Sequence, residues 1–172
     1  MKGILMNQIP VSRLDTSRIF DKIGKQWMLI GAENKSGKVN MMTASWGGVG
    51  VLWNKNVATC YIRPTRYTYG FVEEAENFTL SFYPEEYRKA LSVMGTKSGR
   101  DCDKFDLSGL LQIKLADAVY CDGAELVIVC KKLYAQDMKE DCFIDRSIIA
   151  EDYPKKDFHR VYVGEITAVY VK

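Results

Sequence analysis

Short apolar runs separated by turn clusters dominate the first third of the chain. Residues 27–33 form such a run and end at the turn cluster 34–37, so we expect a buried strand there. A hairpin that returns through 39–46 is the natural continuation. The glycines within 47–50 then predict a loop at the end of the returning strand.

Over residues 57–94 the spacing of apolar residues switches between that of a strand and that of a helix. The β-branched and aromatic residues of 57–62 predict a third strand, and apolar side chains at every fourth position over 67–75 predict a helix. Residues 78–83 alternate again as a strand that Pro84 stops. A second helix is predicted over 87–94, where apolar residues keep helical spacing.

The rest of the chain is predicted to be mainly strand. Residues 96–105 are charged and aperiodic, which predicts a loop, whereas 118–121, 125–134 and 159–171 are rich in β-formers. About seven strands and only two short helices favour a closed antiparallel barrel, because a parallel sheet would need long crossover helices.

Length and composition fit one soluble domain. A chain of 172 residues can bury one substantial core, so we expect a single domain over 1–172. Residues 1–26 have no clear period and are predicted to be an extension that packs on the barrel or on a dimer partner.

Charge and cysteine usage narrow the function classes. Lys and Arg number 24 against 22 Asp and Glu, a balance that favours a small molecule or protein partner over nucleic acid or a membrane surface. The first residues contain no secretory or membrane-spanning run, so a cytoplasmic protein is expected. The five cysteines show no CxxC spacing, which argues against a disulfide framework or a metal site.

Two stretches carry the residue types that hold a phosphate. Residues 40–48 and 63–68 combine hydroxyl side chains, arginines and backbone amides at strand ends, and a helix predicted to begin near Tyr67 would aim its N-terminal amides at the same place. Neither stretch is a P-loop or a dinucleotide-binding glycine motif. The alternative is that Arg63 and Arg66 are solvated or paired with acidic residues of 73–76.

Three other features are open to two interpretations each. Trp46 is either a core residue or a platform for a ligand. The sole histidine, His159, is either a catalytic group near a redox ligand or a hydrogen-bonded residue at a strand entry. The cations of 97–104 either attract an anionic nucleotide or redox partner, or are solvated among the acidic residues of 101–106.

Four segments together resemble a known family. Residues 40–47 (NMMTASWG), 63–68 (RPTRYT), 78–81 (FTLS) and 159–166 (HRVYVGEI) resemble the flavin reductase-like FMN-binding split-barrel family, in the form found in flavoredoxin-type members. The resemblance implies a mainly β Greek-key split β-barrel with short helices. It also implies a homodimer with one non-covalent FMN per subunit near the interface.

The resemblance also implies roles for individual residues. The isoalloxazine and ribityl phosphate would be lined by Thr43, Ala44, Ser45 and Trp46. The phosphate end would be held by Arg63, Arg66 and Thr68, and a loop made of Thr96, Lys97, Ser98 and Gly99, together with Lys104, would close over the flavin.

The implied function is that of an FMN-binding oxidoreductase of the flavoredoxin or flavin reductase-like kind, which transfers electrons from NADH or NADPH to a flavin or a redox partner protein. The alternative is a non-catalytic FMN-binding or electron-carrier module. Segment 52–56 lacks the prolines frequent in reductases that supply monooxygenases, so direct NAD(P)H oxidation is not implied. Pyridoxamine-phosphate oxidase chemistry uses a similar barrel, and no feature of the sequence favours it.

Overall fold

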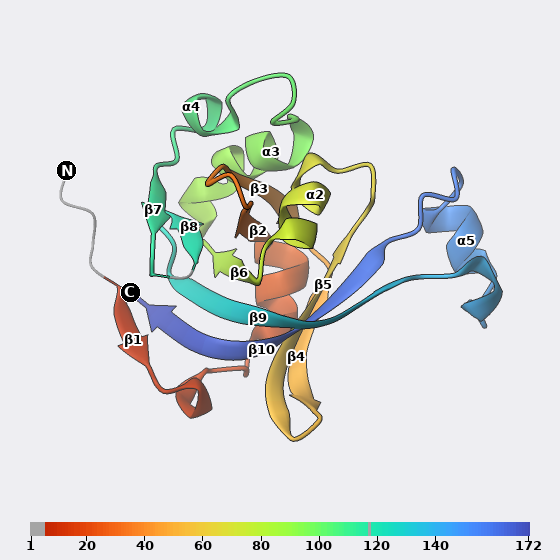
Figure 1. Ribbon diagram of the computed structural model, residues 1–172, viewed down its shortest axis with the longest axis horizontal. Coiled ribbons are helices and arrows are strands. Elements are labelled where there is room, and N and C mark those ends of the chain that lie inside the picture. Colours follow the sequence, from red (N-terminus) through yellow and green to blue (C-terminus); the bar gives the residue numbers. More distant parts are fainter. Residues whose placement is uncertain (1–5, 117) are drawn as a thin grey trace.

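The computed structural model describes residues 6–116 and 118–172, and consists mainly of antiparallel strands with short helices between them (Figure 1). The strands are β1 (Asn7–Ile9), β2 (Met28–Glu33), β3 (Val39–Ala44), β4 (Gly47–Leu52), β5 (Lys55–Ile62), β6 (Asn77–Phe82), β7 (Gln112–Lys114), β8 (Val119–Cys121), β9 (Leu126–Asp137) and β10 (Arg160–Val171). The helices are α1 (Ile19–Asp21), which a π-helix Lys22–Gln26 continues, α2 (Tyr67–Glu74), α3 (Arg88–Thr96), α4 (Lys104–Ser108) and α5 (Ser147–Asp152).

One antiparallel sheet carries the fold. Its strand order is β3-β2-β6-β9-β10-β5-β4, with β1 paired to the far end of β10, while β7 and β8 form a small second sheet. The two end strands, β3 and β4, follow each other in the chain and are joined only by Ser45 and Trp46. These two residues therefore lie where the sheet is split.

The alternation of side chains along the strands produces two apolar layers. In β2, Met28 and Ile30 belong to one core cluster and Leu29 to the other, and β9 divides in the same way, whereas β6 places only polar Thr79 and Ser81 on the second side. Helix α2 covers the first layer with Phe71 and Val72, whereas α3 covers the second. Successive strand residues point to opposite faces, so both faces of these central strands are buried.

The two longest strands reach out of the barrel. β9 and β10 pair along their whole length and run together toward α5 (Figure 1). The chain between them, residues 138–159, forms an excursion that returns to the barrel at His159, immediately before β10. We refer to residues 138–159 as the excursion.

Two predictions about local structure were wrong. The glycines of 47–50 do not form a loop, because they belong to β4, which pairs with β5 from Gly47 opposite Cys60 to Leu52 opposite Lys55. Gly47 has to lack a side chain here, since a Cβ would lie 2.9 Å from the Thr59 carbonyl oxygen. The segment predicted as a loop at 96–105 ends earlier than expected, where α4 begins at Lys104.

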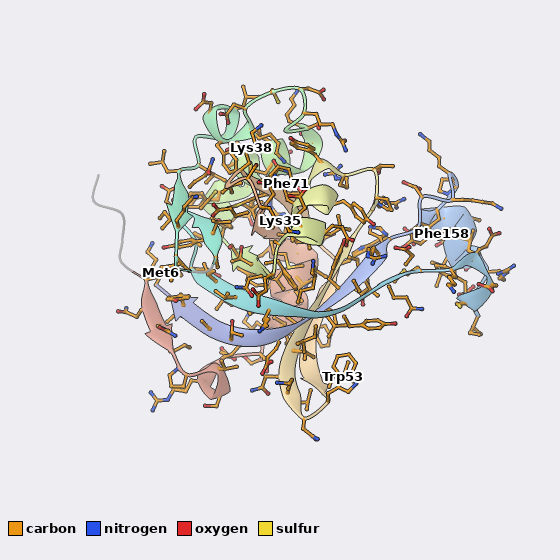
Figure 2. All side chains as sticks on the ribbon, viewed as in Figure 1. Met6, Lys35, Lys38, Trp53, Phe71 and Phe158 are labelled. Atoms are coloured by element: carbon orange, nitrogen blue, oxygen red, sulfur yellow. The ribbon has the colours of Figure 1, made fainter. Side chains whose placement is uncertain are left out.

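The turn between β4 and β5 consists of Trp53 and Asn54, both with positive φ, as a type I′ hairpin requires. Trp53 stands at the free end of this hairpin (Figure 2). The predicted strands over 27–33, 39–46, 57–62, 78–83, 118–121, 125–134 and 159–171 are confirmed within a few residues, and so are the two helices. Helix α5 and strand β7 were not predicted.

The described part of the N-terminal extension lies on the barrel. β1 pairs with β10, and Ile23 of the π-helix is buried in the first core layer. The first five residues of the predicted extension lie outside the described residues. None of the helices within 6–116 and 118–172 is long and apolar enough to cross a membrane.

The close packing of the sheet can be tested by a substitution at Gly164. A Cβ on this residue would lie 2.7 Å from the Cys130 Cβ and 2.8 Å from the Phe78 ring, both in the core. Gly164→Ala should therefore lower the free energy of unfolding by about 1–3 kcal/mol. Gly50→Ala is the matched control, because a Cβ on this strand glycine meets nothing within 4 Å. Equal urea midpoints for the two variants would contradict the close packing at Gly164.

Candidate functional site

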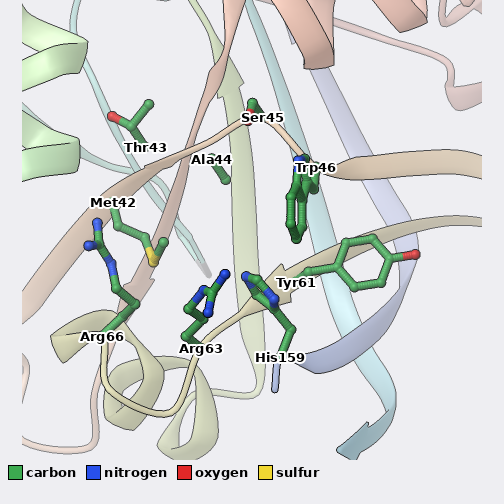
Figure 3. A pocket seen from close by; sticks show the side chains of 9 residues that line it. All are labelled: Met42, Thr43, Ala44, Ser45, Trp46, Tyr61, Arg63, Arg66 and His159. Carbon is green, nitrogen blue, oxygen red and sulfur yellow. The ribbon is translucent and has the colours of Figure 1, made fainter. Parts of the chain in front are cut away.

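Two strand ends meet beside the start of β10 and line a cavity of about 220 Å³, which we call the strand-end pocket (Figure 3). β3 and its link to β4 supply one wall, and the end of β5 supplies the other. The lining residues are Met42, Thr43, Ala44, Ser45, Trp46, Tyr61, Arg63, Arg66 and His159. All four predicted residues of the 43–46 motif thus line one pocket.

Aromatic rings form one side of the strand-end pocket. The rings of Trp46 and His159 have centroids 4.9 Å apart at 50° (Figure 3). His159 is buried, whereas 42% of Trp46 is exposed, so the indole offers a free face to a ligand. Of the two interpretations of Trp46, the ligand platform is the one that fits its exposure.

Arg63 is held by the excursion. Its guanidinium forms an ion pair of 2.7 Å with Asp157, donates to the Asp152 carbonyl at 2.7 Å and lies 4.9 Å from the centre of the Tyr153 ring. The hydrogen bond from Arg63 lowers the pKa of Asp157. The predicted contact of Arg63 with a phosphate stays a prediction, because its charge already has a partner.

A second cavity, also of about 220 Å³, adjoins the first, and we call it the cation pocket. It lies between the N-terminus of α2 and the C-terminus of α3, and shares Met42 and Arg66 with the strand-end pocket. Its lining residues are Met42, Thr65, Arg66, Tyr67, Thr68, Thr96, Lys97, Ser98, Arg100, Asp101 and Lys104.

Positive charge exceeds negative charge in the cation pocket, where four cationic side chains face one carboxylate, that of Asp101. In the described residues, no carboxylate lies within 4.0 Å of any of its four cationic side chains. Burial, and then repulsion from Arg63, lowers the pKa of Arg66. Burial, and then repulsion from Arg66, lowers the pKa of Lys104 to about 8. Desolvated cations without a counter-charge favour a bound anion.

The backbone around the cation pocket adds to this preference. No side chain caps the N-terminus of α2 at Arg66, so the first amides of the helix are available to a ligand. Lys104 is 3% exposed, and its ammonium donates to the carbonyls of Met41 and Met94. Arg66 donates to the Gly95 carbonyl, which directs the guanidinium toward the same pocket.

The predicted hydroxyl groups have different roles. Thr68 is buried in the cation pocket and accepts a hydrogen bond of 2.8 Å from the amide of Asn40, which leaves its own proton free. Thr43 donates instead to the Leu91 carbonyl at 2.5 Å and Thr96 to the Ser92 carbonyl at 2.8 Å. These two hydroxyls secure α3 and do not point their protons at a ligand.

The loop after α3 closes one side of the cation pocket. Arg100 donates to the Thr65 carbonyl at 3.2 Å and lies 5.0 Å from the centre of the Tyr67 ring, so the loop is fixed to the start of α2. Gly99 allows this close approach, because a Cβ would lie 2.6 Å from Asn40 Oδ1. Thr96, Lys97 and Ser98 line the cation pocket and Gly99 lines a neighbouring cavity, and their closing over a flavin stays a prediction.

His159 is neutral at physiological pH. Burial, and then repulsion from Arg63, lowers its pKa to about 4. Its Nδ1 lies 2.8 Å from the Tyr153 hydroxyl, so Nε2 is the ring nitrogen left for a ligand. His159 is thus hydrogen-bonded at a strand entry and also lines the strand-end pocket, and a catalytic role stays a prediction.

Asn40, Tyr153 and Asp157 contribute to the site and were not predicted as site residues. Asn40 lies within the quoted motif, in the end strand β3, and is buried. Tyr153 and Asp157 come from the excursion, which has no periodic pattern in the sequence. Only the fold brings them to Arg63.

The fold and the two joined pockets define a mainly β protein suited to a flat ligand with an anionic group. A family model described as "Flavin reductase like domain" matches residues 20–172, and the chain belongs to this family. The predicted family and the predicted split-barrel fold are thereby confirmed.

Solved structures of similar fold come from several organisms. An FMN-binding domain of a flavin reductase-like enzyme from Shewanella baltica OS155 has a TM-score of 0.70 and 14% identity, covering 99% of this chain and 79% of that chain. Flavoredoxin from Desulfovibrio vulgaris (Miyazaki F) has a TM-score of 0.65 and 23% identity, covering 85% and 69%. A split-barrel protein from Shewanella frigidimarina NCIMB 400 has a TM-score of 0.68 and 18% identity, covering 94% and 76%. A search of curated proteins by sequence found no match.

Sulfate tests the cation pocket without any cofactor. Sulfate should raise the melting temperature of the protein, because it binds only the folded state. Arg66→Ala should remove most of this increase, whereas Arg13→Ala, which changes an exposed arginine, should leave it intact.

The effect should also weaken as pH rises through about 8, because Lys104 then loses its proton while sulfate keeps its charge. A sulfate effect that is equal in wild type and Arg66→Ala would contradict the anion site.

Proposed function

We propose that the chain binds FMN without a covalent bond and acts as an oxidoreductase that passes electrons through it. The observation that carries the proposal is the cation pocket, whose charges lack carboxylate partners and which opens into the strand-end pocket beside Trp46. A phosphate group attached to a flat ring system fits this pair of pockets. Membership of the flavin reductase-like family supports the same cofactor class.

In this proposal, the cation pocket binds the phosphate of FMN and the strand-end pocket binds its ring system. Arg66, Lys104 and the N-terminal amides of α2 would hold the phosphate, with the Thr68 hydroxyl as a further donor. The backbone of 44–46 and the indole of Trp46 would hold the ring system. Here the proposal departs from the predicted phosphate contact of Arg63: because its charge is paired with Asp157, Arg63 would fix the wall of the pocket.

Bound FMN supplies the electron-transfer chemistry, and the protein supplies binding, orientation and electrostatics. The neutral imidazole of His159 presents Nε2 toward the strand-end pocket while Tyr153 holds Nδ1. His159 can therefore exchange a hydrogen bond with the ring system or with a second substrate, but adds no positive charge there at neutral pH.

The electron donor we propose is NADH or NADPH, and the acceptor is a flavin or a redox partner protein. Lys97 and Arg100 line the cation pocket without an ion pair among the described residues, which suits an anionic donor or an acidic partner. The second candidate function is an electron carrier that binds FMN but does not oxidise NAD(P)H directly.

FMN and riboflavin together test the proposed cofactor site. The purified protein should take up equimolar FMN, measured by flavin fluorescence. Arg66→Ala should weaken FMN binding by at least about tenfold, because a charge-assisted hydrogen bond to the phosphate is lost. Riboflavin lacks the phosphate, so its affinity should change little in the same variant.

A colourless protein that does not take up FMN would refute the cofactor. Equal losses for FMN and riboflavin would mean that Arg66 acts through the fold. Anaerobic mixing with NADH or NADPH separates the two candidate functions, since rapid bleaching of the flavin band favours the reductase, and slow bleaching favours the carrier.

We further propose that two copies of the chain associate through the β4–β5 hairpin. Val51 is 74% and Trp53 54% exposed at its end, and Leu52 of the same hairpin and Leu133 and Tyr134 of β9 are also exposed. The rings of Trp53 and Tyr134 have centroids 6.2 Å apart, so the end of the hairpin contacts β9 through these two residues. We call these five residues the hairpin patch. Clustered exposed aromatic and aliphatic side chains are typical of subunit interfaces.

Val51→Glu tests this interface by adding a charge to the hairpin patch. The variant should be monomeric by light scattering at concentrations where wild type is dimeric, because a carboxylate is costly to bury. Leu111→Glu is the control, since Leu111 is 68% exposed but lies outside the patch. A monomeric wild type would refute the proposed dimer.

A further inference from the structure

A third cavity lies beyond Trp46, and we call it the apolar cavity. Its volume is about 500 Å³, within the range of small-molecule sites. Four parts of the chain line it: α1 with the π-helix that continues it, the link between β3 and β4 with the first residue of β4, Tyr61 of β5, and the excursion. None of its lining residues carries a charge.

The apolar cavity adjoins the strand-end pocket. Ser45, Trp46 and Tyr61 line both spaces, so the partly exposed indole of Trp46 is a wall of each. A molecule in the apolar cavity would therefore lie next to whatever occupies the strand-end pocket. The cation pocket adjoins the strand-end pocket through Met42 and Arg66, two residues that are not part of the apolar cavity.

Aromatic packing supports the excursion wall of the apolar cavity. The ring of Phe143 lies 5.6 Å from that of Tyr153 and 5.5 Å from that of Phe158, centroid to centroid. The guanidinium of Arg63 lies over the Tyr153 ring and forms an ion pair with Asp157. The wall is thus aromatic, and the charge of the arginine that contacts it is paired with Asp157.

We infer that the apolar cavity is a binding site for an uncharged, flat aromatic molecule, which it brings beside the FMN site. The inference rests on the proposed function for the neighbouring pockets. A dinucleotide does not fit the apolar cavity, because its phosphates would find no cation there. Aromatic rings on an uncharged ligand find both stacking partners and hydroxyl groups, from Tyr61 and Ser45.

The probe pair is 2-naphthol and 2-naphthalenesulfonate, which share a ring system and differ in charge. We expect 2-naphthol to bind in equilibrium dialysis, both with and without FMN present. The sulfonate should bind at least about tenfold more weakly, because its charge has no partner in the apolar cavity.

Two variants and a control locate the bound probe. Ile148→Arg places a charge in the wall, and Gly24→Leu fills the space, since a Cβ on Gly24 meets nothing within 4 Å. Each should weaken 2-naphthol binding by at least about tenfold. Ile144→Arg should leave it unchanged, because this exposed residue belongs to the same excursion but does not line the cavity.

Absent 2-naphthol binding, or equal binding by wild type and both variants, would overturn the inference. A change of oligomeric state in Ile148→Arg would also overturn it, since a second copy of the chain would then be the occupant. FMN affinity, measured on the same samples, separates the two proposals. Naphthol binding without FMN uptake would refute the cofactor and leave the apolar cavity as a ligand site.

Discussion

A buried lysine organises the site. The ammonium of Lys104 bridges the carbonyls of Met41 in β3 and Met94 in α3, and thereby joins the sheet to the helix that borders the cation pocket. Taking a charge out of water is costly, and two carbonyls offset only part of that cost. Arg66 adds a second desolvated charge nearby. A bound anion would offset more of this cost, so binding and stability are parts of the same electrostatic problem.

Arg63 and Arg66 are close in sequence but do different work. Arg66 faces the cation pocket, whereas Arg63 pairs with Asp157 and fixes the excursion against the barrel. The same ion pair keeps Tyr153 beside His159, and the cationic guanidinium helps to hold that imidazole neutral. In the proposed function, Arg66 thus binds the charged group of the ligand, whereas Arg63 sets the shape and electrostatics of the aromatic wall.

The sequence predicted the parts of the site that depend on local pattern. Strand alternation located the ends of β3 and β5, and the helix beginning at Tyr67 followed from its spacing, so Trp46, Arg66 and Thr68 could be assigned to neighbouring places. The partner of Arg63 could not be predicted, because Asp157 lies 94 residues away in an aperiodic segment. The glycines of 47–50 were misassigned for a related reason: pairing with β5 supplies hydrogen bonds that outweigh their weak strand propensity.

The two-residue link between β3 and β4 has an evolutionary consequence. Ser45 and Trp46 line both the strand-end pocket and the apolar cavity. Because side chains alternate along a strand, inserting or deleting one residue in this link would exchange the faces that β4 presents. The excursion, by contrast, joins two long strands and meets the barrel through a small set of contacts around Arg63. A change in the length or lining of the excursion would therefore alter the apolar cavity and leave the lining of the cation pocket unchanged, because no excursion residue lines the cation pocket.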